Sequence, residues 1–277
     1  MKKFIMIMSL VMALALFAGC TPAGNTPAGD TAKGDYEVIK NAGQMIIGIT
    51  EYEPMNYYDA DGKLIGFDTE YAEAVCEILG VKAEFRVINW KTKETELAAG
   101  NIDCIWNGLT VTEERKEDMD FTTPYLTNKQ CVVISKANAD KFTTAESLAG
   151  AILTAESGSA GETAILADAN LSKATFTGAE SQKSALVALA AGNADAAVVD
   201  ITLAAASVGE GSYADLMMLE DIELVDEQYA IGFRVGSDLT AKVNEATYTL
   251  IDNGTLASLA EKYELTERYE EALNIGK

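Results

Sequence analysis

The sequence predicts an α/β protein of two lobes, each a mostly parallel sheet flanked by helices, with two crossings of the chain between them. The segments LAAGNIDCIW (97–106) and LAAGNADAAVV (189–199) share one order of elements. In both, a helix ends at a glycine, a polar turn follows and a short apolar strand comes next, which is half of a strand–helix–strand unit. Chance similarity between alanine-rich helices explains the identical residues of the two segments equally well. The shared order of helix, glycine and strand is the firmer observation. Extended segments near 129 and 229 separate the two sets of units and suggest the crossings.

Hydrophobic periodicity places the elements in order along the chain. In the first set we expect strands at 45–50, 83–88, 102–106 and 129–135, and helices at 67–80 and 91–100. In the second set we expect strands at 151–156, 174–176, 195–200 and 226–235, and helices at 159–169 and 182–192. Helices at 242–254 and 255–263 close the chain. The first lobe is then formed by 36–124 and 230–277, the second by 130–224, and the hinges by 125–129 and 225–229.

The first 19 residues are typical of an export signal. Lys2 and Lys3 precede an almost wholly apolar run, 4–18, and small residues come directly before Cys20. The segment FAGC, ending at Cys20, resembles a bacterial lipobox, whose cysteine becomes the lipidated N-terminus, although that pattern usually has leucine three residues before the cysteine. An uncleaved membrane anchor is the alternative, and it also leaves the domain tethered outside the membrane. Residues 20–35 carry no large apolar side chain, so we expect a flexible tether.

Composition excludes several classes of function. The formal net charge is −22, which argues against nucleic acid and anionic membranes as partners. The chain has no histidine, so nucleophilic machinery with a histidine base is excluded. No CxxC pair is present either, and we expect no metal or cofactor. Cys76, Cys104 and Cys131 each lie in an apolar run and read as buried core residues.

The segment NGLTVTEER (107–115) carries the first functional signal. It follows the apolar run 102–106 and suggests a strand, a polar loop and a helix start with Thr112 as N-cap. Arg115 in the first helical turn has the wrong sign for the helix dipole. Backbone N–H groups, the Thr110 hydroxyl and the Arg115 guanidinium together would suit a carboxylate or a phosphate. The alternative is a solvated face on which the neighbouring glutamates neutralise the arginine.

The second lobe carries a counterpart. Ser159 and Glu162 have the spacing of a capping box, so Ser159 should cap a helix whose N–H groups, including that of Ala160, face outward. Asp200 ends the apolar strand AAVVD; it is either the N-cap of the next helix or an acceptor for an ammonium group. An anion clamp opposite such an acceptor is what the zwitterion of an α-amino acid requires.

Four segments together resemble a known family over nearly the whole mature chain. GKLIGFDTEYAEAVCEILG, NGLTVTEERKEDMDFTTPY, AESGSAGE and the VN…L…NG…KY ending are similar to the polar amino-acid-binding proteins of bacterial ABC importers, the family 3 extracellular solute-binding proteins with the type II periplasmic-binding-protein fold. The resemblance implies that Thr110 and Arg115 bind the ligand carboxylate, with backbone groups of Asn107 and Gly108 and help from Ser159 and Ala160. It places Asp200 at the ligand ammonium.

The resemblance also suggests a side-chain pocket. Tyr52 and Trp90 would sandwich the ligand side chain, unless both are merely core residues, and Glu51 would meet its polar end. Two departures stand out: YEPM replaces the usual aromatic-Pro-Pro-aromatic run, and Glu156 stands where some relatives have lysine or glutamine. Acids at Glu51, Glu53 and Glu156 would suit a cationic side chain, whereas charge runs are usually solvated faces.

These observations predict an extracytoplasmic, lipid-anchored, monomeric solute-binding protein that captures a polar L-amino acid between closing lobes and docks on an importer permease. A basic amino acid is one candidate. We expect no covalent chemistry. One alternative is an enzyme resembling cyclohexadienyl dehydratases on the same scaffold, with Glu51 or Glu156 as general acid. The other is a surface protein for sensing or adhesion.

Overall fold

The structure is a computed structural model that describes residues 34–222 and 224–275. The predicted signal peptide, the predicted lipidation site Cys20 and nearly all of the predicted tether lie outside the described residues. Within them the chain begins with helix α1 (Asp35–Ala42), which the sequence analysis did not predict. No helix of the described part is long and apolar enough to cross a membrane.

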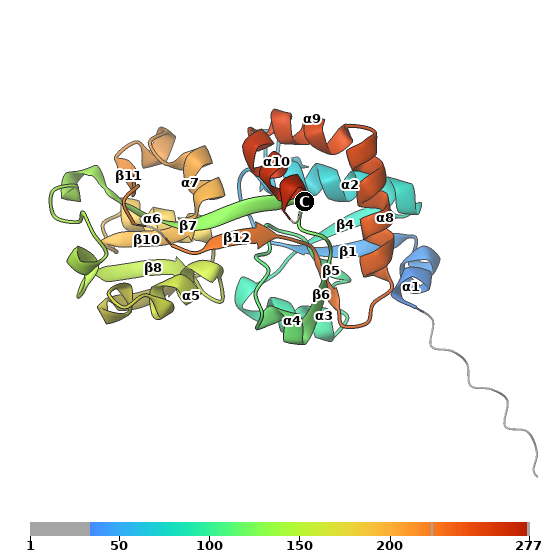
Figure 1. Cartoon of the computed structure of the whole chain (residues 1–277), viewed down its shortest axis with the longest axis horizontal. Coiled ribbons are helices and arrows are strands. Elements are labelled where there is room, and N and C mark those ends of the chain that lie inside the picture. Colours follow the sequence, from blue (N-terminus) through green and yellow to red (C-terminus); the bar gives the residue numbers. More distant parts are fainter. Residues whose placement is uncertain (1–33, 223, 276–277) are drawn as a thin grey trace, which may run out of the picture. The chain divides into compact units, whose positions relative to one another are not determined.

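The first lobe is built on a five-stranded sheet in the order β4-β1-β5-β13-β6 (Figure 1). Its strands are β1 (Gln44–Ile49), β4 (Lys82–Val87), β5 (Cys104–Ile105), β6 (Met119–Phe121) and β13 (Gly232–Arg234). β1 pairs in parallel with β4 and β5, whereas β13 pairs antiparallel with β5 and β6. Since β13 comes from the C-terminal part of the chain, the first lobe is completed only after the chain has passed through the second.

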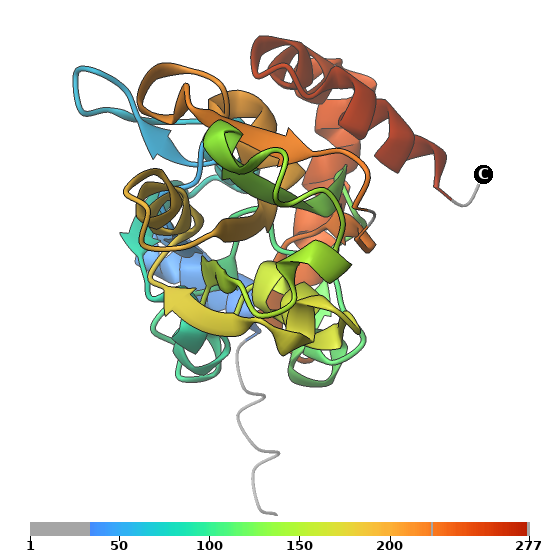
Figure 2. The same cartoon turned by 90° about the vertical axis from the view of Figure 1, so that its left-hand side faces the viewer.

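Besides α1, the described part of the first lobe contains six α-helices. They are α2 (Phe67–Leu79), α3 (Lys93–Ala98), α4 (Arg115–Asp118), α8 (Leu239–Asp252), α9 (Thr255–Lys262) and α10 (Thr266–Asn274). A small hairpin of β2 (Tyr57–Tyr58) and β3 (Leu64–Ile65) precedes α2. The three C-terminal helices, red in Figure 2, lie together, with α8 packed on α9 and α9 on α10. The apolar face of α2 buries large side chains against α8 and α9, which joins the two ends of the chain in one core.

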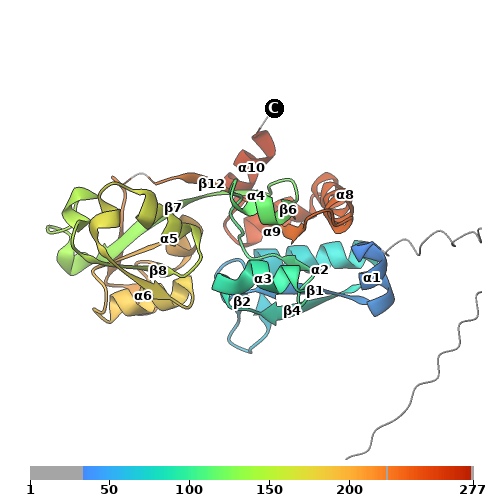
Figure 3. The same ribbon diagram turned by 90° about the horizontal axis from the view of Figure 1, so that it is seen from below.

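The second lobe holds the other main sheet, in the order β11-β7-β10-β8-β9. Its own elements are β8 (Ile152–Glu156), α5 (Ala160–Ala167), β9 (Thr175–Ala179), α6 (Gln182–Ala190), β10 (Ala196–Asp200), α7 (Ile201–Ser207) and β11 (Leu216–Leu219). β10, β8 and β9 are parallel. Helices α5 and α6 lie on opposite faces of this sheet (Figure 3). Side chains of β10 alternate between the two faces accordingly, Val198 packing in the core with α5 and Val199 in the core with α6.

The two crossings run side by side as β7 (Leu126–Ser135) and β12 (Asp226–Tyr229). They pair antiparallel, from Leu126 opposite Tyr229 to Lys129 opposite Asp226. The residues that pair, 126–129 and 226–229, fall in the ranges 125–129 and 225–229 for which hinges were predicted. The prediction of one strand over 226–235 was wrong, because the chain leaves β7 after Tyr229 and joins the first-lobe sheet as β13. The predicted two-lobed α/β architecture is confirmed.

Candidate ligand-binding site

The loop that follows β5 enters the space between the lobes, and Asn107 fixes its start. The side-chain Oδ1 of Asn107 accepts hydrogen bonds from the N–H (3.0 Å) and hydroxyl (2.7 Å) of Thr50. Its Nδ2 donates to the Thr50 carbonyl (3.0 Å) and to Oδ1 of Asn56 (2.7 Å). The amide is therefore fully occupied within the first lobe, and only the backbone of Asn107 is left for a ligand.

Gly108 is held by a buried acid. Its N–H donates to Oδ2 of Asp68 at 2.7 Å. The backbone has φ 57°, and a Cβ here would lie 2.6 Å from the Tyr52 ring, so a residue with a side chain does not fit. Since the N–H is engaged, only the carbonyl of Gly108 can face a ligand.

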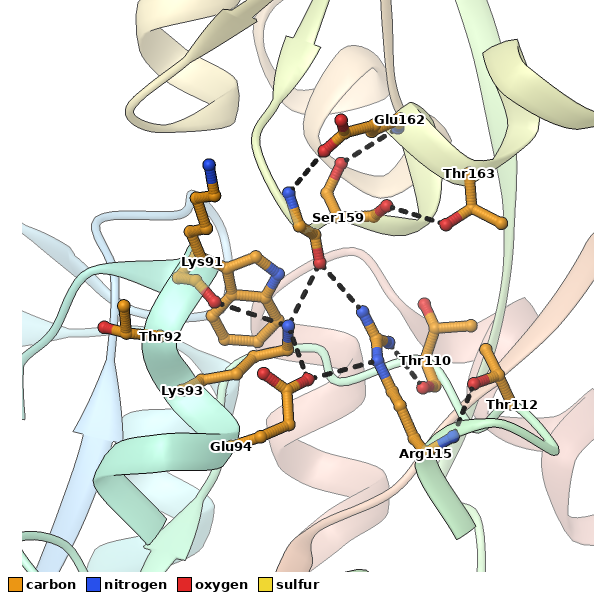
Figure 4. A network of polar contacts seen from close by, with 12 residues as sticks. Lys91, Thr92, Lys93, Glu94, Thr110, Thr112, Arg115, Ser159, Glu162 and Thr163 are labelled. Carbon is orange, nitrogen blue, oxygen red and sulfur yellow. Dashed lines mark hydrogen bonds and ion pairs between the residues drawn. The ribbon is translucent and has the colours of Figure 1, made fainter. Parts of the chain in front are cut away.

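Arg115 reaches across the loop toward the second lobe (Figure 4). Its N–H donates to the Thr112 hydroxyl (3.1 Å), as expected for a cap, while its side chain turns back with Nη1 on the Thr110 carbonyl (2.7 Å). Nη2 donates to the carbonyl of Gly158 in the second lobe at 3.2 Å. Burial lowers the pKa of Arg115, and the carboxylate of Glu94 is the largest of the opposing effects. A ligand carboxylate in place of the Gly158 carbonyl would give this buried guanidinium a charged partner.

Lys93 makes a second contact of the same kind. This buried ammonium donates to the Gly158 carbonyl (3.0 Å) and the Trp90 carbonyl (3.3 Å), and it pairs with Glu94 (2.8 Å; Figure 4). Burial, together with the neighbouring Arg115, lowers the pKa of Lys93 to about 8. Two cations of the first lobe therefore converge on one carbonyl of the second. The sequence analysis missed Lys93, because a lysine in a helical run ordinarily faces solvent.

The second lobe presents the predicted helix start. Ser159 caps α5 by accepting from the N–H of Glu162 (3.2 Å), and the Glu162 carboxylate reaches back to the N–H of Gly158 (2.6 Å). The capping box thus closes one residue earlier than the standard arrangement, in which the glutamate bonds the capping residue itself. Ser159 and Ala160 both line the cavity between the lobes.

Asp200 ends β10 and points into a cluster of side-chain amides. It accepts from Nε2 of Gln182, Nε2 of Gln130 and Nδ2 of Asn128, the last at 3.0 Å. Its side chain makes no capping hydrogen bond to α7, so the N-cap alternative does not account for it. Burial raises the pKa of Asp200, and the bonds from Gln182 and Gln130 oppose the rise.

The aromatic side chains predicted for the pocket are both buried and both border the cavity. The Tyr52 hydroxyl is hydrogen-bonded to that of Tyr229 (2.7 Å), and the Lys93 ammonium lies 4.9 Å from the centre of the Trp90 ring. Glu51 lies elsewhere: it is exposed, forms an ion pair with Lys183 of α6 at the rim, and lines a separate depression. Its carboxylate is paired with Lys183 and Glu51 does not line the cavity, so its placement does not support the predicted role.

Glu156 lines the cavity, as Asp200 does. It is only 3% exposed at the end of β8, and its Oε1 has no hydrogen-bond partner. Burial raises its pKa to about 8, with Asp200 adding to the rise and Lys93 and Arg115 opposing it. An unpaired buried carboxyl group that borders a cavity calls for a donor from a ligand or a water molecule.

These groups surround one small cavity. Nine of the ten predicted ligand residues line it, all except Glu51, together with Glu156 and Gln182: Tyr52, Trp90, Asn107, Gly108, Thr110, Arg115, Glu156, Ser159, Ala160, Gln182 and Asp200. Its volume is about 10 Å³, room for about one water molecule. An amino acid therefore needs the lobes farther apart than in this conformation. A larger groove of about 510 Å³ lies beside α10 and holds no comparable clamp.

The buried amides and acids behind Asp200 were missed by the sequence analysis. Asn128 and Gln130 alternate along β7 and so share one face of an otherwise apolar strand, which was the available signal. The described residues contain no group of three or more Cys, Asp or Glu side chains arranged for a metal ion.

Fold and site together define a two-lobed solute-binding protein. Residues 45–266 match the bacterial extracellular solute-binding proteins of family 3, and the chain belongs to this family. It is similar to the L-cystine-binding protein TcyJ of Escherichia coli K12, with 28% identity over 81% of this chain and 84% of that protein. It is also similar to the probable amino-acid-binding protein YxeM of Bacillus subtilis 168, with 32% identity over 74% and 78%.

Solved structures give the same result. A substrate-binding protein of an ABC uptake transporter from Streptococcus pneumoniae with bound histidine has a TM-score of 0.76, 30% identity, and coverage of 84% of this chain and 97% of that one. An ancestral arginine-binding protein bound to arginine has a TM-score of 0.74, 31% identity, and coverage of 80% and 98%. The predicted type II periplasmic-binding-protein fold is confirmed by these likenesses.

Proposed function

We propose that the protein is an extracytoplasmic lipoprotein that captures a polar L-amino acid between its lobes and delivers it to an ABC importer permease. One observation carries the proposal: the clamp of Arg115 and the Thr110 loop shares a single buried cavity with the carboxylate of Asp200. A carboxylate would bind at the first and an ammonium group at the second. Charge-assisted hydrogen bonds in a closed, water-free cleft provide tight capture.

The remaining wall of the cavity favours a basic side chain. Glu156 supplies an unpaired carboxyl group, and Trp90 and Tyr52 supply aromatic surface. A guanidinium group stacks on aromatic rings and binds carboxylates with several N–H groups at once. Related proteins named as arginine-binding support the same choice. We therefore place arginine or a similar cationic amino acid first among the ligands.

Delivery requires that ligand binding and lobe closure occur together. Contacts cross the cleft in this conformation: Arg115 and Lys93 donate to the Gly158 carbonyl, and Lys183 pairs with Glu51. A bound ligand carboxylate would replace the Gly158 carbonyl as the partner of Arg115. The two crossing strands would act as the hinge, and the closed form, acting as a monomer, would dock on the permease. Lipidation at Cys20 would keep the protein beside its transporter.

A dehydratase is the second candidate, and Glu156 is the reason to keep it. A buried carboxyl group whose pKa is about 8 is protonated at neutral pH and could act as a general acid. An ancestral amino-acid-binding protein described as a precursor of cyclohexadienyl dehydratase is 30% identical to this chain, with a TM-score of 0.74. The two functions differ in outcome, because a binding protein returns its ligand unchanged.

A ligand screen tests the proposal. The chain from residue 20, unfolded and refolded to remove carried-over ligand, is heated with each of the twenty L-amino acids, L-cystine, D-arginine and a cyclohexadienyl acid. At a thousand times its dissociation constant, a ligand adds about 4 kcal/mol of stability. We expect stabilisation by one or a few L-amino acids, recovered unchanged by mass spectrometry.

Paired variants assign the effect to the cavity. Arg115→Met should remove the stabilisation, because truncating one partner of a buried charge pair costs about 2–5 kcal/mol. Arg86→Met makes the same change at an exposed position on β4 and should bind as the wild type does. Stabilisation by no amino acid would contradict the proposal, and conversion of the cyclohexadienyl acid would establish the enzyme instead.

A further inference from the structure

A second buried acid lies beside Asp200. Glu227 belongs to the crossing strand β12 and is 8% exposed. Its carboxyl group accepts hydrogen bonds from Nδ2 of Asn128 (2.8 Å), from Nε2 of Gln130 (3.0 and 3.2 Å) and from the hydroxyl of Thr110 (3.0 Å). No property of the family motif or of the strand pattern pointed to this residue.

Asp200 and Glu227 share their donors. Nδ2 of Asn128 donates to Oδ1 of Asp200 at 3.0 Å and to Oε2 of Glu227 at 2.8 Å. Nε2 of Gln130 likewise contacts both carboxyl groups. Two oxygens that contact the same nitrogen are separated by no more than two hydrogen-bond lengths. The carboxyl groups therefore form a close pair whose shared donors are neutral amides.

No cation among the described residues lies within ion-pair distance of either carboxyl group. Arg115 is the cation that lines the cavity, but its Nη1 and Nη2 are hydrogen-bonded to the Thr110 and Gly158 carbonyls. Tyr52, Tyr229 and Glu156 surround the pair without bringing positive charge. On the far side of the crossing strands, Glu227 borders the groove beside α10. The titratable and charged groups nearby on that side are Lys129, Cys131, Asp226, Glu267, Arg268 and Glu271. The acids there outnumber the cations.

Two like charges buried this close do not both remain ionised. Burial raises the pKa of Glu227 to about 7, and the charge of Asp200 adds to the rise. Burial also raises the pKa of Asp200. In the free protein near neutral pH, the pair therefore shares a proton, as coupled carboxyl groups do.

An amino acid changes this balance, because its ammonium group brings to Asp200 the positive charge and the donors that the pair lacks. We propose that Asp200 and Glu227 form one ammonium-binding pair, which holds a proton in the free protein and releases it to solvent when the α-ammonium group of an amino acid binds. The proton leaves the pair and the ammonium N–H groups donate to it, with no covalent bond made or broken. Glu227 is then a positioning residue for the ammonium subsite, and this role rests on the proposed function.

Isothermal titration calorimetry at pH 7 counts the released protons. The chain from residue 20 is titrated with L-arginine and with L-glutamine, in phosphate and in Tris, whose protonation enthalpies differ widely. For L-glutamine we expect the observed binding enthalpies in the two buffers to differ by up to the difference between the protonation enthalpies of phosphate and Tris, which corresponds to the release of one proton. We also expect a dissociation constant that falls by up to about tenfold per pH unit between pH 6 and pH 7.

Two variants identify the source of the proton. Glu227→Gln keeps the shape but removes the like charge, so proton release and the pH dependence should both shrink. Glu245→Gln makes the same chemical change on the exposed face of α8 and should behave as wild type. Equal proton release by wild type and Glu227→Gln, or none by wild type, would overturn the proposal.

A ligand-free measurement separates this proposal from the proposed function. Because the folded pair keeps a proton that the unfolded chain loses at lower pH, it makes the free energy of unfolding decrease as the pH rises from about 5 to about 7. This decrease should be smaller in Glu227→Gln. The free energy of unfolding is compared only for variants whose circular dichroism spectrum is that of the wild type. If it then depends on pH identically in wild type and Glu227→Gln, the two acids do not share a proton, whether or not an amino acid binds. Failure of both probes to bind, together with a reduced decrease in Glu227→Gln, would retain the proton-sharing pair and reject the amino-acid ligand.

Discussion

Asp68 is fully buried behind the loop that carries Arg115, and Asp68→Asn should change how stability depends on pH. Its Oδ2 accepts from the N–H of Gly108 (2.7 Å) and from the hydroxyl of Tyr125 (3.0 Å), whereas its Oδ1 has no partner. Asparagine has nearly the same shape, and its carbonyl oxygen can accept both bonds. The substitution therefore removes the titration and keeps the support for Gly108.

The magnitude follows from the pKa of this group. Burial raises the pKa of Asp68 from 3.8 to about 7, and the bonds from Gly108 and Tyr125 only partly oppose the rise. Between these values the folded protein holds a proton that the unfolded chain has lost, so stability decreases as the pH rises. From pH 5 to pH 7, two pH units at 1.36 kcal/mol each amount to about 3 kcal/mol. Asp68→Asn should lack this decrease.

A second effect of the substitution does not depend on pH. The amide nitrogen of the variant takes the place of the unpartnered Oδ1 and is an unsatisfied buried donor at every pH, which costs about 1–3 kcal/mol. The protonated carboxyl group of the wild type carries a similar donor at low pH, so this cost does not create the predicted change with pH. The test is therefore the difference between the two profiles across pH and not the stability at a single pH.

Urea denaturation from pH 5 to pH 8, followed by tryptophan fluorescence, measures both profiles. Other buried acids contribute to both proteins and cancel in the comparison. Asp61→Asn, in an exposed loop of the same lobe, makes the same chemical change and should follow the wild-type profile. Parallel profiles for Asp68→Asn and wild type would show that Asp68 is ionised in the folded protein and that burial does not control its charge.

Three further substitutions test other parts of the site. Glu156→Gln should lower affinity for L-arginine while leaving affinity for L-citrulline nearly unchanged, measured by calorimetry; equal losses for both would contradict contact with the ligand side chain. Glu51→Gln should change the free energy of ligand binding by less than about 1 kcal/mol, because its ion pair with Lys183 is exposed. A larger loss would show that Glu51 contacts the ligand. Ser159→Ala should lower the free energy of unfolding by about 1 kcal/mol through loss of the α5 cap, with unchanged stability as the contrary result.

Local sequence patterns were enough to predict most of the fold. Gly80, Gly100 and Gly192 were expected to end helices, and all three have positive φ, which glycine adopts without strain. The strand that ends at Asp200 and the loop that follows β5 also lie where the apolar runs placed them. In each case the signal lies within a few residues, so no knowledge of distant contacts was needed.

Elements that depend on distant partners were not predictable. Periodicity gave a single strand over 226–235, but it could not show that the chain changes its pairing partner from β7 to β5 and β6. Helix α10 was missed because its sequence TERYEEALN is largely polar. It is stabilised mainly by packing on α9 and β7, and such tertiary contacts override weak local signals.

The residues of the site were likewise predictable only where their signal is local in the sequence. Thr110, Arg115 and Ser159 could be found because each belongs to a short pattern with a physical meaning. Glu227 and its amide partners could not, since Asn128 lies 99 residues from Glu227 and 72 from Asp200 along the chain. A polar residue in an apolar strand shows that a buried partner is needed, but the sequence does not show which residue it is.

In the proposed site, protonation links the ammonium subsite to the identity of the ligand side chain. The acid pair would meet the α-ammonium group of any amino acid, whereas Glu156 would meet only the side chain. With its pKa at about 8, Glu156 is protonated in the free protein at pH 7 and must lose that proton to bind a cation. A neutral side chain such as that of glutamine should therefore release at most one proton at this pH, and arginine should release up to two. Release of one proton on binding of each ligand would show that Glu156 does not bind the ligand side chain. It would leave the proposal for the acid pair unchanged.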